Sequence, residues 1–275
     1  PEVLAKVLCS PRVRMPDLLL VGSRWALEAG MRAAGLTLET PPMVNSAAQM
    51  VALGYPVALL EVGVPRPERF EFGVVQTPCG RHAVRAIEIA TELCQRGEVG
   101  AMVTCPINKQ AIHAVGDVDD IGHQEILARL SGARCTATML MTPGLRVVHL
   151  STHKSLIEAA RYVTRANVLE KLALMFETLE RWGVPAPRIA VAALNPHAGE
   201  GGLLGREEIE ELTPAVEDAR ARGIDATGPI PADSVFNRAI AGEFDAVLAL
   251  YHDQGHIAIK VHDFHASTTA TLGIP

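Results

Sequence analysis

The strongest constraint on the fold of this chain is a pattern that occurs three times. In each case an apolar segment is followed closely by a histidine. Each segment holds five to seven mostly apolar residues, which is typical of a strand buried in a parallel sheet. They are followed within three residues by His153, His197 and His252. Because ligands of parallel α/β sheets bind beyond the carboxyl ends of the strands, these imidazoles are predicted to lie where a substrate or a metal ion binds. The segments span residues 146–150, 188–194 and 246–250.

The bulk composition describes a globular protein of one large or two ordinary domains. Of its 275 residues, 48% are hydrophobic and 20% are charged. The net charge of -6 argues against nucleic acid or an anionic membrane as a partner, and no apolar run reaches the roughly 18 residues of a membrane span. Five cysteines, an odd number without a CxxC pair, argue against a disulfide framework and favour a cytoplasmic location. Neither Pro1 nor Pro275 is accompanied by a closing signal, so we expect a fragment of a longer chain.

Strand and helix patterns alternate along the chain and predict α/β layers. Two neighbouring strand patterns form a predicted hairpin, which makes the sheet mixed. Two lobes are compatible with this succession, although no linker marks a boundary. Strands are predicted at residues 18–21, 57–62, 100–104, 136–141, 146–150, 188–194 and 244–250. Helices are predicted over residues 23–35, 81–96, 155–162, 166–182 and 207–221. Three further helices are predicted: one that begins near residue 110, a short one that ends at Gly132, and one that Asp233 caps at its start.

Three imidazoles at three strand ends are able to form a catalytic metal site with positions left open for water and substrate. The separations of 44 residues between His153 and His197, and 55 between His197 and His252, fit no local zinc motif. The alternative is that each imidazole simply bonds a backbone carbonyl. Polar neighbours that could support metal-bound imidazoles favour the metal site: Thr152, Asn195, Glu200 and Asp253. His82, His113 and His149 lack such neighbours and are expected to be surface or packing residues.

Glycines and lysines add weaker signals. The glycines of residues 199–205 do not have dinucleotide-loop spacing and are expected to form a flexible loop before a helix, so a nicotinamide cofactor must bind without a Rossmann fingerprint. Gly255 is expected to let the chain turn after His252. Lys109 is interpreted as a surface charge, whereas Lys260 could hold an anionic substrate group beside the metal.

Seven sequence blocks resemble the 4-hydroxythreonine-4-phosphate dehydrogenase family, the metal-dependent NAD enzymes of vitamin B6 synthesis and their catabolic relatives. The blocks occur in the family's order over nearly the whole chain: CPINK, GHQE, THKSL, NPHAGEGGLLGREE, GPIPAD, YHDQGHIAIK and TLGIP. The resemblance implies a two-lobed isocitrate/isopropylmalate dehydrogenase-like α/β fold with mixed sheets and a central cleft. It also implies a homodimer with a shared active site. We expect residues 1–116 with 253–275 to form the first lobe and residues 117–252 the second.

The resemblance also implies the cofactors and the residue roles. His153, His197 and His252 would bind one divalent metal (zinc, cobalt, magnesium, manganese or nickel). His123, Gln124, Lys260 and Thr269 would contact a small anionic substrate, with His123 and Lys260 as the catalytic pair, and NAD or NADP would accept the hydride.

The expected reaction is oxidation of a secondary alcohol followed by decarboxylation. Gln124 replaces the family's usual threonine and Thr269 its asparagine. 4-Hydroxythreonine-4-phosphate is therefore placed first, with a four-carbon sugar-acid phosphate or an aromatic-acid cis-dihydrodiol such as that of terephthalate close behind. A metal-dependent hydrolase or lyase, and a non-catalytic binding protein, are the alternatives of a different class.

Overall fold

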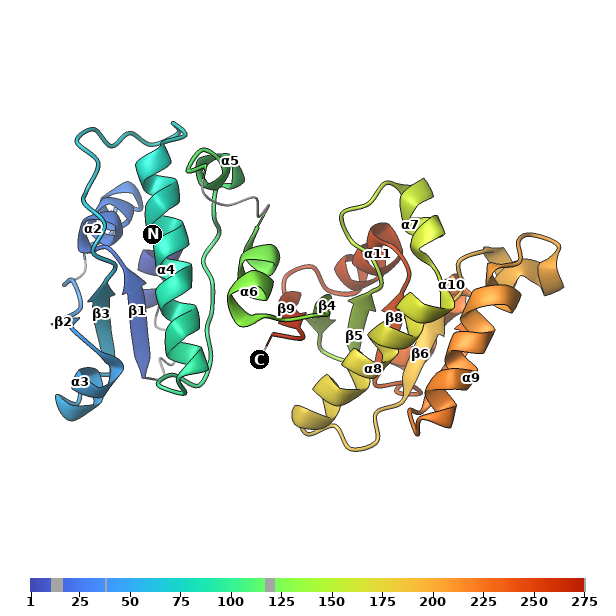
Figure 1. Ribbon diagram of the computed structural model, residues 1–275. Helices are drawn as coiled ribbons and strands as arrows, with labels where there is room; N and C mark the ends of the chain where they lie inside the picture. The colour runs from blue at the N-terminus through green and yellow to red at the C-terminus, as the bar shows by residue number, and fades with distance from the viewer. Residues whose placement is uncertain (11–16, 38, 117–121, 275) are drawn as a thin grey trace. The chain divides into compact units, whose positions relative to one another are not determined.

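A computed structural model describes residues 1–10, 17–37, 39–116 and 122–274 of the chain. The described residues form two compact units, Pro1–Gly132 and Ala133–Ile274 (Figure 1), and both are α/β, as predicted. All five cysteines are free thiols. Among the described residues, no helix has both the length and the apolar character needed to cross a bilayer.

The first unit is built on a small parallel sheet of strand order β1-β3-β2. Apolar residues of β1 and β3 pack with those of two helices, and Leu20, Leu27 and Leu59 are buried there. The elements are α1 (Glu2–Leu8), β1 (Leu18–Gly22), α2 (Arg24–Ala33), β2 (Met43–Val44), α3 (Ala47–Ala52), β3 (Val57–Glu61), α4 (Thr77–Gln95), α5 (Lys109–His113) and α6 (His123–Ser131).

The second unit is built on a six-stranded mixed sheet of order β7-β6-β8-β5-β4-β9. β7, β6, β8 and β5 are parallel, whereas β4 runs antiparallel to both β5 and β9, so the predicted hairpin and mixed sheet are confirmed. The strands are β4 (Ala137–Thr142), β5 (Leu145–His149), β6 (Ile189–Ala192), β7 (Ala226–Ile230), β8 (Ala246–Ala249) and β9 (Thr268–Leu272). The helices are α7 (Leu156–Tyr162), α8 (Arg165–Arg181), η1 (Pro196–Gly202), η2 (Glu208–Leu212), α9 (Thr213–Ala221), α10 (Ala232–Ile240) and α11 (His252–His262).

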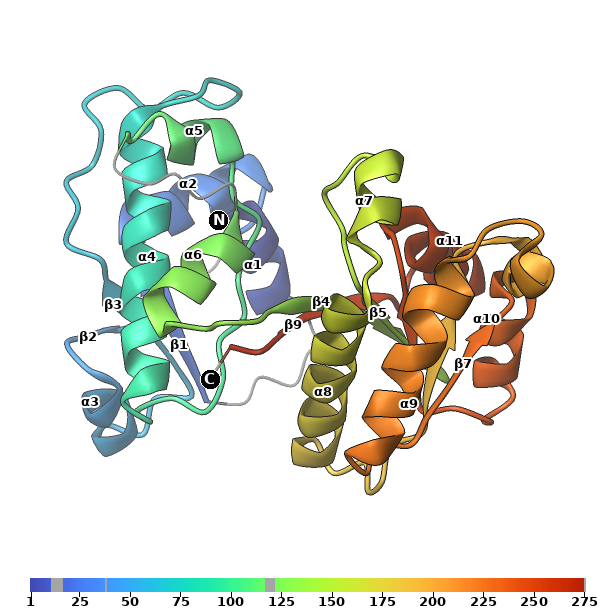
Figure 2. The same ribbon diagram turned by 45° about the vertical axis from the view of Figure 1, so that its right-hand side comes forward.

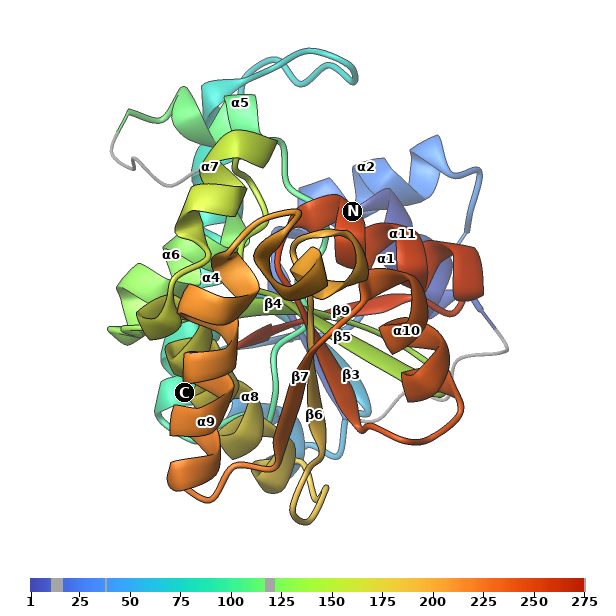
Figure 3. The ribbon, with the colours of Figure 1, turned by 90° about the vertical axis from the view of Figure 1, so that its right-hand side faces the viewer.

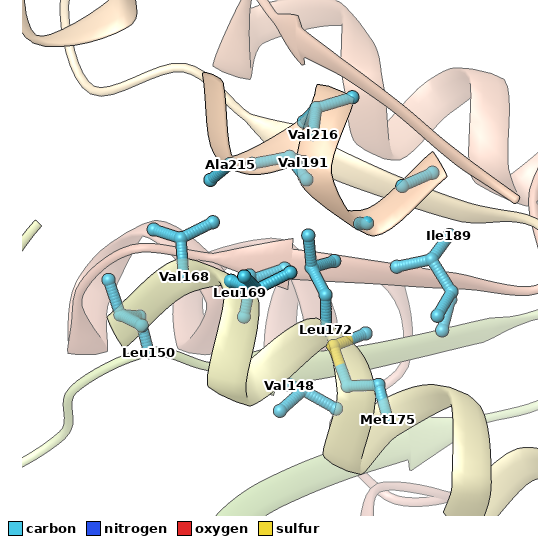
Figure 4. Close-up of a cluster of buried hydrophobic side chains, with 14 of the residues drawn as sticks. Val148, Leu150, Val168, Leu169, Leu172, Met175, Ile189, Val191, Ala215 and Val216 are labelled. Atoms are coloured by element: carbon cyan, nitrogen blue, oxygen red, sulfur yellow. The ribbon is translucent and has the colours of Figure 1, made fainter. Parts of the chain in front are cut away.

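Helices cover both faces of this larger sheet, which explains why its central strands are apolar on both sides. α8 and α9 lie side by side on one face (Figure 2), and α10 and α11 lie on the other (Figure 3). Leu172 and Met175 of α8 are fully buried against Val148 and Val191 of the sheet (Figure 4). Because burying one such side chain contributes about 1.5–3 kcal/mol, this core provides a rigid support for the strand ends.

The structure differs from the sequence-based expectations in one strand, in the division into units and in one helix cap. Residues 100–104 form no strand although the run is mostly apolar, and Val103 is 93% exposed, because this run pairs with no other strand among the described residues. Residues 253–274 belong to the second unit instead of the first lobe, because β9 pairs with β4 and α11 packs on β5. Residues 122–132 belong to the first unit instead of the second lobe, because α6 packs on α4. Asp233 lies in the first turn of α10, whose N-cap is Pro231.

Candidate active site

The three predicted histidines follow three neighbouring strands at the same edge of the larger sheet. β8 lies between β5 and β6 and is parallel to both, so the three carboxyl ends point the same way. His153 follows β5, His197 follows β6 and His252 follows β8. The predicted placement of all three at strand ends of one sheet is therefore confirmed at the level of the backbone.

Two polar side chains tie these strand ends together. Gln254, only 9% exposed, accepts a hydrogen bond from Leu250 N (2.7 Å) and donates one to Ala193 O (2.8 Å), so it links the ends of β8 and β6. Ser151 Oγ donates to Leu250 O (3.2 Å) and links the ends of β5 and β8. Since a buried polar group is costly to leave unpaired, these contacts hold the three ends in register.

His252 is the first residue of α11, and its imidazole forms a cluster with those of His149 and His256. Its Nδ1 lies 2.6 Å from Asp253 Oδ1, and its ring stacks on His256 with centroids 3.7 Å apart. His256 Nδ1 lies 3.1 Å from Nε2 of His149, which is 1% exposed. Burial, helped by the neighbouring imidazole of His256, lowers the pKa of His149 to about 4, and burial also lowers the pKa of His256. These two rings are therefore neutral near pH 7.

Gly255 has a different role from the predicted turn. It lies inside α11, and the helix continues through it to residue 262. A Cβ at this position would overlap His149 Nε2 and come within 2.8 Å of Val147 Cγ1. The glycine therefore allows α11 to approach β5 closely, which brings His252 and His256 next to His149.

His197 lies in an unusual backbone turn. Residues 197–201 all have positive φ, between 47° and 80°, so η1 contains five consecutive residues in the left-handed helical region. Three of these five are not glycine, and such residues enter this region at a cost. His197 Nδ1 lies 2.8 Å from Glu200 Oε1 within the turn. The glycine-rich residues 199–205, expected to form a loop before a helix, take part in this turn and lead into η2.

The donor chemistry at this edge fits a divalent transition metal. Three imidazoles are suitable ligands, and Nδ1 of His197 and of His252 are each paired with a carboxylate, which leaves Nε2 as the ligand atom. The rings do not converge as placed: across the part of the chain that the structure describes, no group of three His, Cys, Asp or Glu side chains is close enough to hold a metal ion. A metal site here requires rotation of the rings, because His252 is stacked on His256.

The predicted substrate-binding residues of the second unit lie on α11 and β9. Lys260 is exposed, and its Nζ lies 5.9 Å from the centre of the Phe264 ring. It follows His252 by eight residues on the same helix, which corresponds to a rise of about 12 Å. Thr269 is exposed on β9, where it pairs with Leu140 of β4.

The predicted residues of the first unit lie at the start of α6. His123 Nε2 is buried and has no hydrogen-bond partner among the described residues, and burial lowers the pKa of His123. Gln124 follows it in the same turn. An orphaned ring nitrogen in a neutral imidazole is a group that a ligand can satisfy. Lys109 begins α5 and is exposed, as expected of a surface charge.

Several residues at the sheet edge escaped sequence-based reasoning. His149 was expected to be a surface or packing residue, and its 1% exposure agrees with packing, whereas His256, Gln254 and Glu208 received no role. Gln254 and Glu208 carried a usable signal, since a polar residue directly after a buried strand or a glycine-rich loop must find partners there.

Comparison with known proteins agrees with the observed fold. Residues 14–275 match the family model described as "Pyridoxal phosphate biosynthetic protein PdxA". The D-threonate 4-phosphate dehydrogenase of Salmonella typhimurium is 40% identical over 277 residues, which cover 100% of this chain and 84% of that protein.

Solved structures show the same fold. A crystal structure of 4-hydroxythreonine-4-phosphate dehydrogenase from Klebsiella pneumoniae matches with a TM-score of 0.91 at 34% identity, covering 100% of this chain and 83% of that one. A terephthalate 1,2-cis-dihydrodiol dehydrogenase from Burkholderia xenovorans matches with a TM-score of 0.65 at 27% identity over 93% of this chain and 77% of that one. A hydrolase, a lyase or a non-catalytic binding protein finds no support among these relatives. The chain is a dehydrogenase that belongs to the family of the pyridoxal phosphate biosynthetic protein PdxA.

Proposed function

We propose that this protein oxidises the C3 hydroxyl of a four-carbon acid 4-phosphate with NAD and releases the carboxylate as carbon dioxide. The observation that carries the proposal is the set of three histidines behind three adjacent parallel strands in a chain of this dehydrogenase family. Oxidation at C3 gives a β-keto acid, and a β-keto acid loses carbon dioxide through an enolate.

His153, His197 and His252 would hold the divalent metal through Nε2, with Glu200 and Asp253 orienting two of the rings from Nδ1. A divalent metal, when bound, lowers the pKa of a substrate hydroxyl and stabilises enolate charge. NAD, when bound, accepts the hydride, and the protein contributes its orientation.

The other residues of the proposal act on the charged groups and on a proton. Lys260 would hold the anionic end of the substrate, and a rise of about 12 Å from His252 suits an extended four-carbon phosphate once the reach of the lysine side chain is included. His123 and Lys260 are the candidates for protonating the enolate carbon, from Nε2 and Nζ. Burial keeps His123 neutral near pH 7 by lowering its pKa, so it would have to gain its proton on substrate binding. Gln124 and Thr269 would contact the substrate.

We place D-threonate 4-phosphate ahead of 4-hydroxythreonine 4-phosphate as the substrate. The two molecules share the C3 hydroxyl, the carboxylate and the phosphate, and they differ at C2, which carries a hydroxyl in the first and an amine in the second. Curated relatives with 36–45% identity carry the first name. The departures at Gln124 and Thr269 agree with a changed substrate.

The test is NADH formation at 340 nm by the full chain loaded with metal. D-threonate 4-phosphate, 4-hydroxythreonine 4-phosphate and a terephthalate cis-dihydrodiol are supplied in parallel, and carbon dioxide release is measured in the same samples. We expect the largest signal with the first substrate and none after His197→Ala. A signal with the second alone reverses the order of the substrates, and a His197→Ala protein with unchanged metal content and turnover refutes the ligand set.

The metal, the assembly and the location have their own measurements. We propose zinc as the metal, a homodimer and a cytoplasmic location. Metal analysis of protein purified without chelator tests the first, light scattering tests the second, and fractionation of the source cells tests the third. Comparing NAD with NADP at equal concentration identifies the preferred cofactor.

A further inference from the structure

Glu208 is a buried carboxyl group whose side-chain hydrogen bonds go to Leu194 and Asn195, just before His197. Its side chain is 3% exposed. Oε1 accepts hydrogen bonds from the backbone N–H of Leu194 (2.9 Å) and of Asn195 (2.8 Å), and Oε2 accepts one from Asn195 Nδ2 (2.9 Å). One side chain therefore fixes two consecutive peptide groups and the side chain at the exit of β6.

Asn195 is in turn held from two sides. Its Nδ2 donates to Glu207 Oε2 at 2.7 Å as well as to Glu208 Oε2. Glu207 follows the glycine-rich segment after Arg206, and the Glu207 pKa is lowered by hydrogen bonds from backbone N–H groups and from Asn195. The Asn195 amide cannot flip without placing its oxygen against these carboxyl oxygens, so its orientation is determined.

The left-handed turn is packed against the same carboxyl group. A Cβ on Gly199 would lie 2.8 Å from Glu208 Oε2 and 3.1 Å from Gly205 O. A Cβ on Gly201, in the same turn, would meet no atom within 4 Å. Glu208 therefore contacts the start of the turn through Asn195 and its middle through Gly199, and His197 lies between these two points.

We propose that Glu208 is a positioning residue that sets the direction of the His197 imidazole through the left-handed turn. The inference rests on the proposed function, in which His197 is a metal ligand. Five consecutive left-handed residues are unfavourable for a free loop, so something must hold them, and the buried carboxyl group supplies three hydrogen bonds at the base of the turn. A turn held in this way presents His197 with little loss of freedom when a ligand binds.

The test uses Glu208→Gln, which keeps the shape of the side chain and its bonds to the two backbone N–H groups but places the NH2 donor of an amide against the Asn195 Nδ2 donor. Glu210→Gln is the matched control, because Glu210 is exposed on the same segment and its carboxylate pairs with Arg206. Affinity for Co²⁺ is measured by calorimetry, together with the visible spectrum of the Co²⁺ protein and the unfolding midpoint of the metal-free protein. We expect Glu208→Gln to weaken Co²⁺ binding by about 10- to 100-fold and to alter the spectrum, with Glu210→Gln like wild type.

The same measurements in a His197→Ala background separate positioning from general stability. If Glu208 acts through His197, Glu208→Gln weakens binding less than about twofold once His197 is absent. An equal loss in both backgrounds, or no loss in the wild-type background, overturns the inference while leaving the metal site intact. Unchanged binding by His197→Ala alone overturns the proposed ligand set, and the inference with it.

A second pair of variants decides the question if Glu208→Gln does not fold. Gly199→Ala and Gly201→Ala both put alanine in the left-handed region, but only the first displaces the Glu208 carboxyl group. The expected result is weaker Co²⁺ binding for Gly199→Ala than for Gly201→Ala at comparable unfolding midpoints. Equal binding by the two variants overturns the inference.

Discussion

Replacing Gly255 by alanine should destabilise the second unit, although the same change stabilises most helices. Gly255 is buried in α11. The added Cβ would overlap His149 Nε2 and lie 2.8 Å from Val147 Cγ1 and 3.0 Å from Ala249 Cβ. The last atom is fixed by the backbone of β8, and the His149 ring has no room to leave because it is 1% exposed. The helix must therefore move away from the sheet.

The expected size follows from two opposing effects. Forcing an extra methyl group into a packed core costs about 1–3 kcal/mol, and contacts this short place the cost near 3 kcal/mol. Alanine recovers about 1 kcal/mol of helix propensity relative to glycine. The net loss is about 2 kcal/mol, which lowers the unfolding midpoint of a unit of this size by about 6 °C.

Urea unfolding followed by circular dichroism measures this loss, with Ile257→Ala as the control. Ile257 lies on the same helix with a 60% exposed side chain, so its truncation should cost little. We also expect Gly255→Ala to weaken metal binding, because the start of α11 carries His252. A Gly255→Ala protein at least as stable as wild type would refute the close approach of α11 to β5.

Three further changes test the core, a helix cap and an ion pair. Leu172→Ala should lower the free energy of unfolding, measured in urea, by about 2–5 kcal/mol because Leu172 is fully buried. Leu203→Ala, at an 83% exposed position, should change this free energy little. Equal effects of the two variants would contradict the assigned core. Ser155→Ala removes the capping box of α7 and should cost about 1 kcal/mol, seen as faster hydrogen exchange confined to that helix; unchanged exchange would contradict the cap. The hydrogen bond and the charge of Arg188 lower the pKa of Asp245 in the folded protein. The ionised Asp245 carboxyl group therefore stabilises the fold above its unfolded pKa of about 3.9. This stabilisation is lost as the pH falls through the lower pKa of the folded state. Asp245→Asn should therefore cost about 1 kcal/mol at pH 7, a value discounted for the exposure of Arg188, and less below pH 3.9; a constant deficit across this range would contradict the ion pair.

The sequence was sufficient to predict the strand ends but not the contacts between them. His153, His197 and His252 were located correctly because a buried strand has a local signature and its carboxyl end is where polar residues follow. Residues 101–104 carry the same signature and form no strand, since pairing depends on a partner that a local pattern does not contain. Residues 268–272 were not predicted as a strand, although they pair with β4.

Glycine was the residue type that local reasoning misread. Gly255 was expected to form a turn and Gly199 a flexible loop. Both instead leave room for a group from a distant part of the chain, His149 in one case and Glu208 in the other. A missing Cβ permits a positive φ, a close approach or both, and only the tertiary structure distinguishes these uses.

The position of β8 in the larger sheet has a consequence for how the molecule is made. β8 is the last of the three histidine-bearing strands in the chain, yet it lies in the middle, between β5 and β6. Until it has left the ribosome, β5 and β6 have no common neighbour, and the sheet edge that carries His153 and His197 is open at its centre. Its late insertion is a long-range step, which is slow to form. A sheet edge that carries all three histidines therefore requires β8, and a chain interrupted before residue 246 holds the first two histidines without the strand that lies between β5 and β6.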